Sequence, residues 1–264
     1  MKKKTSLWHT VLLMLGSYAF GFNLHNIIHE FGHAVTIWLQ GGHMTGFYFH
    51  PFNACYNFST SVPNHIFLYA GGAYIGGLST IIFAILAWRF RTPLMVPLVA
   101  ACSAGLTTTA RWMLTTPFSD VFTDYSSMVA LGVPLTFIIL SGVIFLFIGV
   151  AVRILYLPLV GISQKTGLGR RLIIYLLGIL PYYVGGCVYH NITKGSNFLA
   201  MAPSLGIVAV FLAIEAIFSK LLPQWVSFFR SINPARVRTS HVWAAWLGFI
   251  ILLAVMLIVS TTPE

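Results

Sequence analysis

The sequence predicts an all-α polytopic membrane protein. Hydrophobic residues make up 58% of the 264 positions and charged residues only 8%. A soluble domain of this length needs far more charge to keep its surface wet. Long apolar stretches recur along the whole chain, as expected for helices that cross a bilayer. We therefore expect a single integral membrane domain over residues 1–264.

Seven apolar stretches are predicted to span the membrane. They cover residues 7–39, 66–88, 94–114, 133–155, 172–188, 198–218 and 242–259. Most of them match the ~20 residues that are needed to cross ~30 Å of hydrocarbon. The first stretch is too long for one untilted span. It either tilts and protrudes from the bilayer or breaks near Gly21-Phe22-Asn23.

The distribution of Lys and Arg predicts the orientation. With seven alternating spans, almost all of these residues fall on one side, which marks the cytoplasmic side. They are Lys2, Lys3, Lys4, Arg89, Arg91, Arg153, Lys165, Arg170, Arg171, Lys220, Arg230, Arg236 and Arg238. Lys194 lies in an opposite loop, and Arg111, near the outer end of the third stretch, is the one mild exception. The N-terminus is then cytoplasmic and the C-terminus outside. The net charge of +10 is explained by these loops, so we expect the lipid bilayer as a partner and no nucleic acid.

The segment 41–64 interrupts the helical pattern. Gly41-Gly42 ends the preceding helix, and Pro51-Phe52-Asn53 separates two short runs that are rich in aromatic and β-branched residues, 45–50 and 55–60. This arrangement predicts a short β-hairpin after the first span. A plain belt of interfacial aromatic residues is the alternative interpretation.

One of only five acidic residues lies in the motif His29-Glu30-Phe31-Gly32-His33. On a helix, His29 and His33 stand one turn apart on one face, with Glu30 beside that face. Two imidazoles so placed can bind Zn²⁺, and a neighbouring glutamate can act as general base towards a zinc-activated water. The alternative is a few polar residues that are hydrogen-bonded inside a helix bundle.

A catalytic zinc also needs a third protein ligand and one open position. His25 lies one turn before His29, but successive turns of a straight helix are ~5.4 Å apart, so three such histidines cannot converge on one ion. Glu215 lies in the sixth stretch, near the cytoplasmic Lys220, and so on the wrong side. Asp120 and Asp124 follow the third stretch, on the same outer side as the end of the motif helix. Both remain open as ligands.

A known family shares these motifs. His-Glu-Phe-Gly-His-Ala at 29–34 precedes Gly41-Gly42, a small-residue segment at 70–77, and an aspartate before a short segment that ends in Gly132-Val133-Pro134. Together they resemble the site-2 protease family of intramembrane zinc metallopeptidases, and most closely its compact family-B-like branch. The resemblance covers a metallopeptidase-like core at 20–135 and leaves 136–264 as additional helices. It implies His29, His33 and Asp124 as ligands, with Asp120 as the alternative because the family's usual Leu-Asp-Gly is absent.

The expected function is an intramembrane zinc metalloprotease, of the kind that acts in regulated intramembrane proteolysis. It would hydrolyse peptide bonds of transmembrane or membrane-associated protein substrates, with Glu30 as the catalytic base. A substrate helix must unwind before its carbonyl groups become accessible. Two alternatives are a non-proteolytic membrane scaffold that keeps the zinc and a transporter that uses His and Asp. Gly72-x-x-x-Gly76 is expected to be a helix-packing face, whose partner could be the motif helix.

Overall fold

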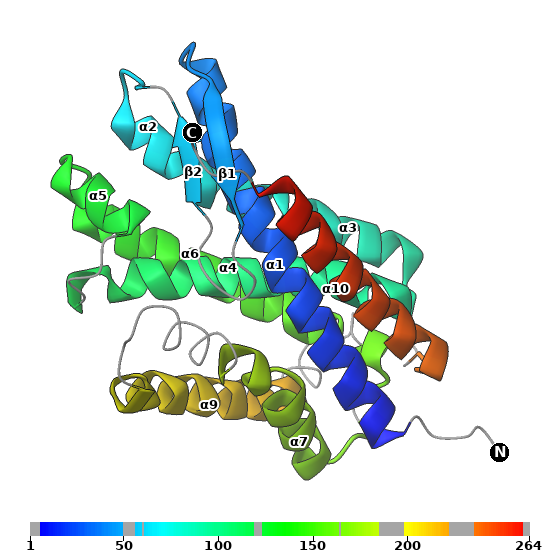
Figure 1. Ribbon diagram of the computed structural model, residues 1–264. Coiled ribbons are helices and arrows are strands. Elements are labelled where there is room, and N and C mark those ends of the chain that lie inside the picture. The colour runs from blue at the N-terminus through cyan, green and yellow to red at the C-terminus, as the bar shows by residue number, and fades with distance from the viewer. Residues whose placement is uncertain are drawn as a thin grey trace.

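The computed structural model describes residues 6–49, 56–59, 61–118, 123–163, 165–184, 198–221 and 235–260. Within them the fold is almost entirely helical (Figure 1). The main helices are α1 (Leu7–Leu39), α2 (His65–Ala70), η1 (Gly71–Gly77), α3 (Ile81–Phe90), α4 (Val96–Thr115), α5 (Asp124–Ala130), α6 (Leu135–Leu155), α7 (Leu168–Gly178), α9 (Phe198–Leu221) and α10 (Thr239–Val259). Short 3₁₀ turns are η2 (Pro93–Met95), η3 (Thr116–Phe118) and η4 (Leu157–Val160).

Five helical segments among the described residues are long and apolar enough to cross a membrane, and each corresponds to one of the seven expected spans. They are Leu7–Leu39, His65–Phe90, Pro93–Thr115, Leu135–Leu155 and Thr239–Val259. The expected span at 172–188 is described only in part: α7 ends at Gly178, helix resumes over 180–184, and residues 185–188 lie outside the described chain. Helix α9 has 24 residues, but much of its first half has no described side chains. The coarse prediction of an all-α membrane protein agrees with the structure.

Helix α1 is continuous and does not break near Gly21. Its 33 residues correspond to roughly 50 Å, so an end must protrude or the helix must tilt. Gly21 instead allows a close crossing with α4, because a Cβ placed there would lie 2.4 Å from the backbone nitrogen of Ala101. As predicted, the glycine pair ends the helix. Gly41 adopts φ 78°, and the N–H of Gly42 donates to the carbonyl of Ile37 at 3.0 Å.

Two short strands follow α1. Strand β1 (Met44–Tyr48) pairs antiparallel with β2 (Tyr56–Ser59). β1 begins one residue before the expected run at 45–50, and β2 lies within the run at 55–60. The turn at Pro51-Phe52-Asn53 lies outside the described residues. Phe31 of α1 stacks on Phe47 of β1 with ring centroids 5.7 Å apart, so this pair of strands lies against the half of α1 that carries the His-Glu motif.

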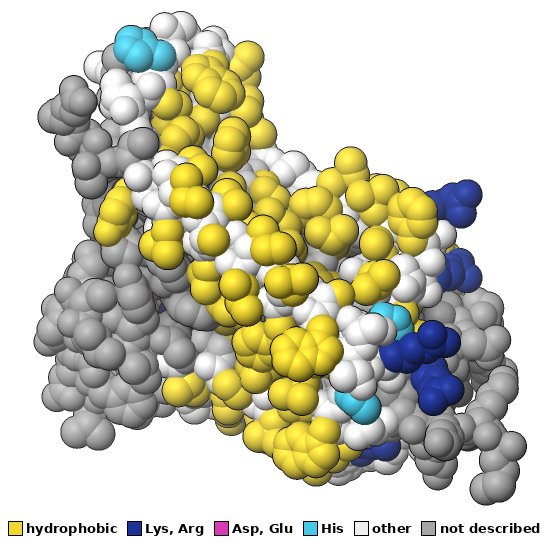
Figure 2. Space-filling view, turned by 45° about the vertical axis from the view of Figure 1, so that its right-hand side comes forward, with side chains coloured by type: hydrophobic (Ala, Val, Ile, Leu, Met, Phe, Trp, Pro, Cys, Tyr) yellow, Lys and Arg dark blue, Asp and Glu magenta, His cyan; other side chains and the backbone are white. Residues whose placement is uncertain are grey.

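Helices α1 and α10 run side by side in the same direction (Figure 1). His9 near the start of α1 contacts Thr239 at the start of α10, with 3.1 Å between Nε2 and Oγ1. At the opposite end, the N–H of Phe49 donates to Oγ of Ser260 at 2.9 Å. Figure 2 shows hydrophobic side chains spread over one face, with Lys and Arg gathered at one end of it.

The segment from α2 to α3 carries a π-helical insertion at Gly71–Gly77. This wide, glycine-rich turn packs directly against α1. A Cβ at Gly32 would lie 2.2 Å from the carbonyl oxygen of Gly71, and one at Gly76 would lie 2.6 Å from that of Ile28. No side chain fits between the two backbones, so Gly76 uses α1 as its packing partner, as the sequence suggested.

Candidate metal centre

Helix α1 positions two of the three candidate ligands. His29 and His33 are four residues apart and project from the same face, and their Nε2 atoms lie 3.2 Å from each other. The side chain of His33 is 6% exposed and that of His29 is 20% exposed. The side chain of Glu30, between them in sequence, is buried at 6% exposure.

Helix α5 brings the third candidate ligand from far along the chain. Asp124 is the first residue of α5, and its Oδ2 lies 3.1 Å from Nε2 of His29 and 3.3 Å from Nε2 of His33. Burial acts to raise the pKa of this carboxyl, but the imidazoles of His33 and His29 outweigh it and hold the pKa below its ordinary value. Among the described residues, these three form one group that could hold a metal ion.

The three donor atoms form a nearly equilateral triangle with edges of 3.1, 3.2 and 3.3 Å. A tetrahedral Zn²⁺ with bonds of ~2.0–2.1 Å places its ligand atoms roughly 3.3–3.4 Å apart. The triangle therefore has the size that zinc coordination requires. Two imidazole nitrogens and a carboxylate oxygen are also ligands that Zn²⁺ accepts. The residues thus fit the metal that the sequence motif predicts.

A backbone contact sets the tautomer of His33. Its Nδ1 lies 2.8 Å from the carbonyl oxygen of Leu68, and a carbonyl can only accept, so Nδ1 carries the proton. In a neutral imidazole, Nε2 then carries the free lone pair, and this atom is one corner of the triangle. Such a second hydrogen bond commonly orients metal-binding histidines. Leu68 gives no sequence signal for this role, because its contribution comes from the backbone.

Gly72 of η1 lies directly beside the donor atoms. A Cβ at this position would be 2.5 Å from Nε2 of His29 and 2.5 Å from Nε2 of His33. Any side chain here would occupy the space around the donors. The sequence pattern indicated helix packing for this glycine, and the structure adds that it leaves room at the candidate metal centre.

Neither His25 nor Glu215 is part of the group. His25 is buried over Gly105 of α4, its ring centroid lies 6.0 Å from that of His29, and its Nδ1 has no hydrogen-bond partner. Glu215 instead pairs with Arg153, at 2.8 Å between Oε2 and Nη1. Asp120 lies outside the described residues.

No protein-family model, no curated protein and no solved structure matches this chain. The chemistry of the site must therefore be judged from its own geometry.

Proposed function

We propose that this chain is an intramembrane zinc metalloprotease that resembles the site-2 protease family. The observation that carries the proposal is the convergence of His29, His33 and Asp124, with donor atoms 3.1–3.3 Å apart. The aspartate comes from a helix 95 residues away from His29 in sequence, yet it completes the ligand set that a His-Glu-x-x-His motif lacks. Zn²⁺ is the proposed cofactor.

Glu30 favours catalysis over simple metal storage. Metal binding by the two histidines and an aspartate does not require a glutamate beside His29. When bound, zinc would act as a Lewis acid and make water easier to deprotonate. The carboxylate of Glu30 would take the proton from the attacking water and pass it to the leaving amide nitrogen of the scissile bond.

The substrate class follows from the membrane setting. The described residues include five helices that are long and apolar enough to cross a membrane, and α1, which carries His29 and His33, is one of them. We therefore propose transmembrane or membrane-associated proteins as substrates. Their backbones would have to unwind before cleavage, because a helix satisfies its own carbonyl groups. The strand pair β1–β2 beside α1 offers backbone edges on which an unwound segment could pair.

We further propose that α1 begins on the cytoplasmic side and that α10 ends on the opposite side. The Lys and Arg distribution supports this orientation. The parallel arrangement of α1 and α10 supports only that both helices begin on one side, because His9 contacts Thr239 at one end and Phe49 contacts Ser260 at the other. To test this orientation, a single cysteine is introduced at position 9 or at position 260, and intact cells are treated with a membrane-impermeant thiol reagent. The proposed orientation predicts labelling at position 260 alone. Labelling at position 9 alone would reverse the orientation.

The test of the function combines metal content with proteolysis. Purified protein should hold about one zinc per chain, and membranes containing it should cleave at least one member of a panel of tagged single-span reporter proteins. Glu30→Gln should keep the zinc and reduce cleavage by several orders of magnitude. Equal cleavage by Glu30→Gln and the wild type would reject the proposed mechanism. Zinc without any cleavage that depends on Glu30 would favour the scaffold alternative.

A further inference from the structure

The aspartate is the least constrained of the three candidate ligands. His29 and His33 are held by a 33-residue helix, whereas Asp124 begins a helix of seven residues. Helices this short are marginal on their own, so their ends must be fixed by other contacts. A donor atom that must stay about 3 Å from two imidazoles needs a defined backbone position.

Two hydroxyl groups fix that backbone reciprocally. Oγ1 of Thr123 accepts the N–H of Ser126 at 3.1 Å, and Oγ of Ser126 accepts the N–H of Thr123 at 2.8 Å. Asp124 lies inside this closed loop of contacts. At the other end of α5, Gly132 adopts φ 97° and the N–H of Val133 donates to the carbonyl of Met128 at 3.0 Å.

The hydroxyl groups of Thr123 and Ser126 also limit which N–H groups the Asp124 carboxylate can bind. An acidic side chain in the first turn of a helix is normally attracted to the free N–H groups there. Here the N–H groups of Thr123 and Ser126 already have hydroxyl partners. The carboxylate of Asp124 does not compete for these two N–H groups, and it contacts His29 and His33 instead.

We propose that Thr123 and Ser126 are positioning residues for the metal ligand Asp124. This inference rests on the proposed zinc site and deepens it. Neither residue contacts the donor triangle; both act through the backbone that carries Asp124. Partners that orient ligands in this way typically change metal affinity by ~10–100-fold when they are removed.

The test measures zinc affinity in the purified full-length chain by competition with a chelating dye. Thr123→Val removes the hydroxyl while keeping the shape, and it should weaken zinc binding ~10–100-fold. Thr123→Ser and Thr123→Asn retain a capping oxygen and should bind zinc within a few-fold of the wild type. Thr92→Val is the matched control, because Thr92 caps the distant turn η2 by accepting the N–H of Leu94.

Cobalt(II) separates positioning from general damage to the fold. At saturating cobalt, Thr123→Val should recover the visible spectrum of the wild type, because all three ligands are still present. A wild-type affinity in Thr123→Val would overturn the inference while leaving the zinc site intact. Equal weakening by Thr123→Val, Thr123→Ser and Thr92→Val would also overturn it, since loss of the cap would then not be the cause. A wild-type chain that binds no zinc would remove the proposed function and this inference together.

Discussion

Two polar clusters in the described part of the helical bundle, one partly buried and one buried, are built in opposite ways. The first is the metal-centre cluster of His29, His33 and Asp124, towards the end of α1. The second is the ion-pair cluster, in which Arg153 of α6 donates to Glu215 of α9 at 2.8 Å and to Ser103 and Thr107 of α4 at 2.9 and 3.1 Å. Both lie among apolar helices, where ionisable groups need a partner or a function.

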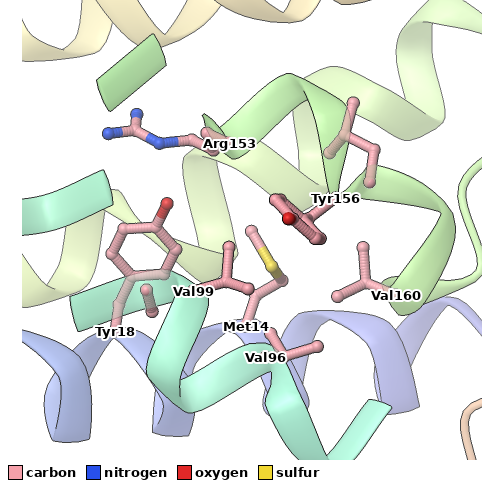
Figure 3. A pocket seen from close by; sticks show the side chains of 9 residues that line it. Met14, Tyr18, Val96, Val99, Arg153, Tyr156 and Val160 are labelled. Atoms are coloured by element: carbon pink, nitrogen blue, oxygen red, sulfur yellow. The ribbon is translucent and has the colours of Figure 1, made fainter. Parts of the chain in front are cut away.

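The ion-pair cluster contains both a cation and an anion, so it balances its own charge. A small cavity beside it is lined mostly by apolar side chains together with Tyr18, Arg153 and Tyr156 (Figure 3). Its volume of about 20 Å³ is room for roughly one water molecule. Charge pairing alone accounts for the ion-pair cluster.

The metal-centre cluster brings together three groups that all offer lone pairs. No Lys or Arg is among the contacts that join them. Hydrogen bonds between the imidazoles and the carboxylate can bridge some of the donor pairs, but a cation at the centre would be shared by all three. The contrast teaches that the identity of converging groups, more than burial, separates a candidate metal site from a structural ion pair.

The largest expected effect on zinc comes from removing both imidazoles. His29→Ala combined with His33→Ala should reduce zinc from about one per chain to none, because a single carboxylate cannot hold the ion. Elemental analysis of the purified chain measures the zinc content, and a monodisperse elution profile in detergent checks that the variant is folded. Full zinc content in the double variant would show that the metal lies elsewhere.

Loss of the third ligand comes next. Asp124→Asn should weaken zinc binding strongly, because an amide is a poorer ligand than a carboxylate, while His29 and His33 still hold some metal. Asp120→Asn, four residues earlier, is the matched control and should act only weakly. If Asp120→Asn lost more zinc than Asp124→Asn, the assignment of the third ligand would be reversed.

A smaller effect is expected from filling the space beside the donors. Gly72→Ala would place a methyl group 2.5 Å from both Nε2 atoms, so η1 or the imidazoles must shift and zinc affinity should fall. Gly77→Ala is the control in the same helical segment, because its nearest non-neighbouring atom is 3.7 Å away in Phe145. Competition with a chelating dye compares the two. Equal affinities would mean that Gly72 serves helix packing alone.

The sequence predicted the part of the site that lies within one helix. His29, Glu30 and His33 form a local motif whose geometry follows from the helical repeat. From the residues alone, the third ligand could be narrowed to Asp120 or Asp124 but not assigned. The approach of Asp124 to the two histidines depends on how α4, η3 and α5 are arranged in space. The contact from the Leu68 carbonyl was not predictable, since any residue supplies the same backbone oxygen.

The fold shows the same division. Hydrophobicity predicted the helical class, and Gly41-Gly42 predicted where α1 ends. Apolar composition at 172–188 did not indicate the interruption after Gly178, where α7 ends. The expected spans at 172–188 and 198–218 stay predictions, because residues 185–197 lie outside the described part of the chain. Glu215 carried a charge that the sequence could place near a membrane face, but its pairing with Arg153 joins residues 62 positions apart.

The ion-pair cluster provides the prediction with the smallest effect on zinc. Glu215→Gln keeps the shape of the side chain and removes its charge, which leaves Arg153 buried at 5% exposure without a carboxylate. Breaking a buried ion pair from one side typically destabilises a protein by about 3–5 kcal/mol, because the remaining charge loses its compensation. The midpoint of thermal unfolding in detergent should therefore fall, while zinc content stays at about one per chain.

Replacing both partners by apolar residues, with Arg153→Met and Glu215→Leu together, should restore most of that stability, since neither charge then remains buried. A double variant as unstable as Glu215→Gln would show that the cluster contributes more than charge balance, and loss of zinc in Glu215→Gln would show that the two clusters are coupled.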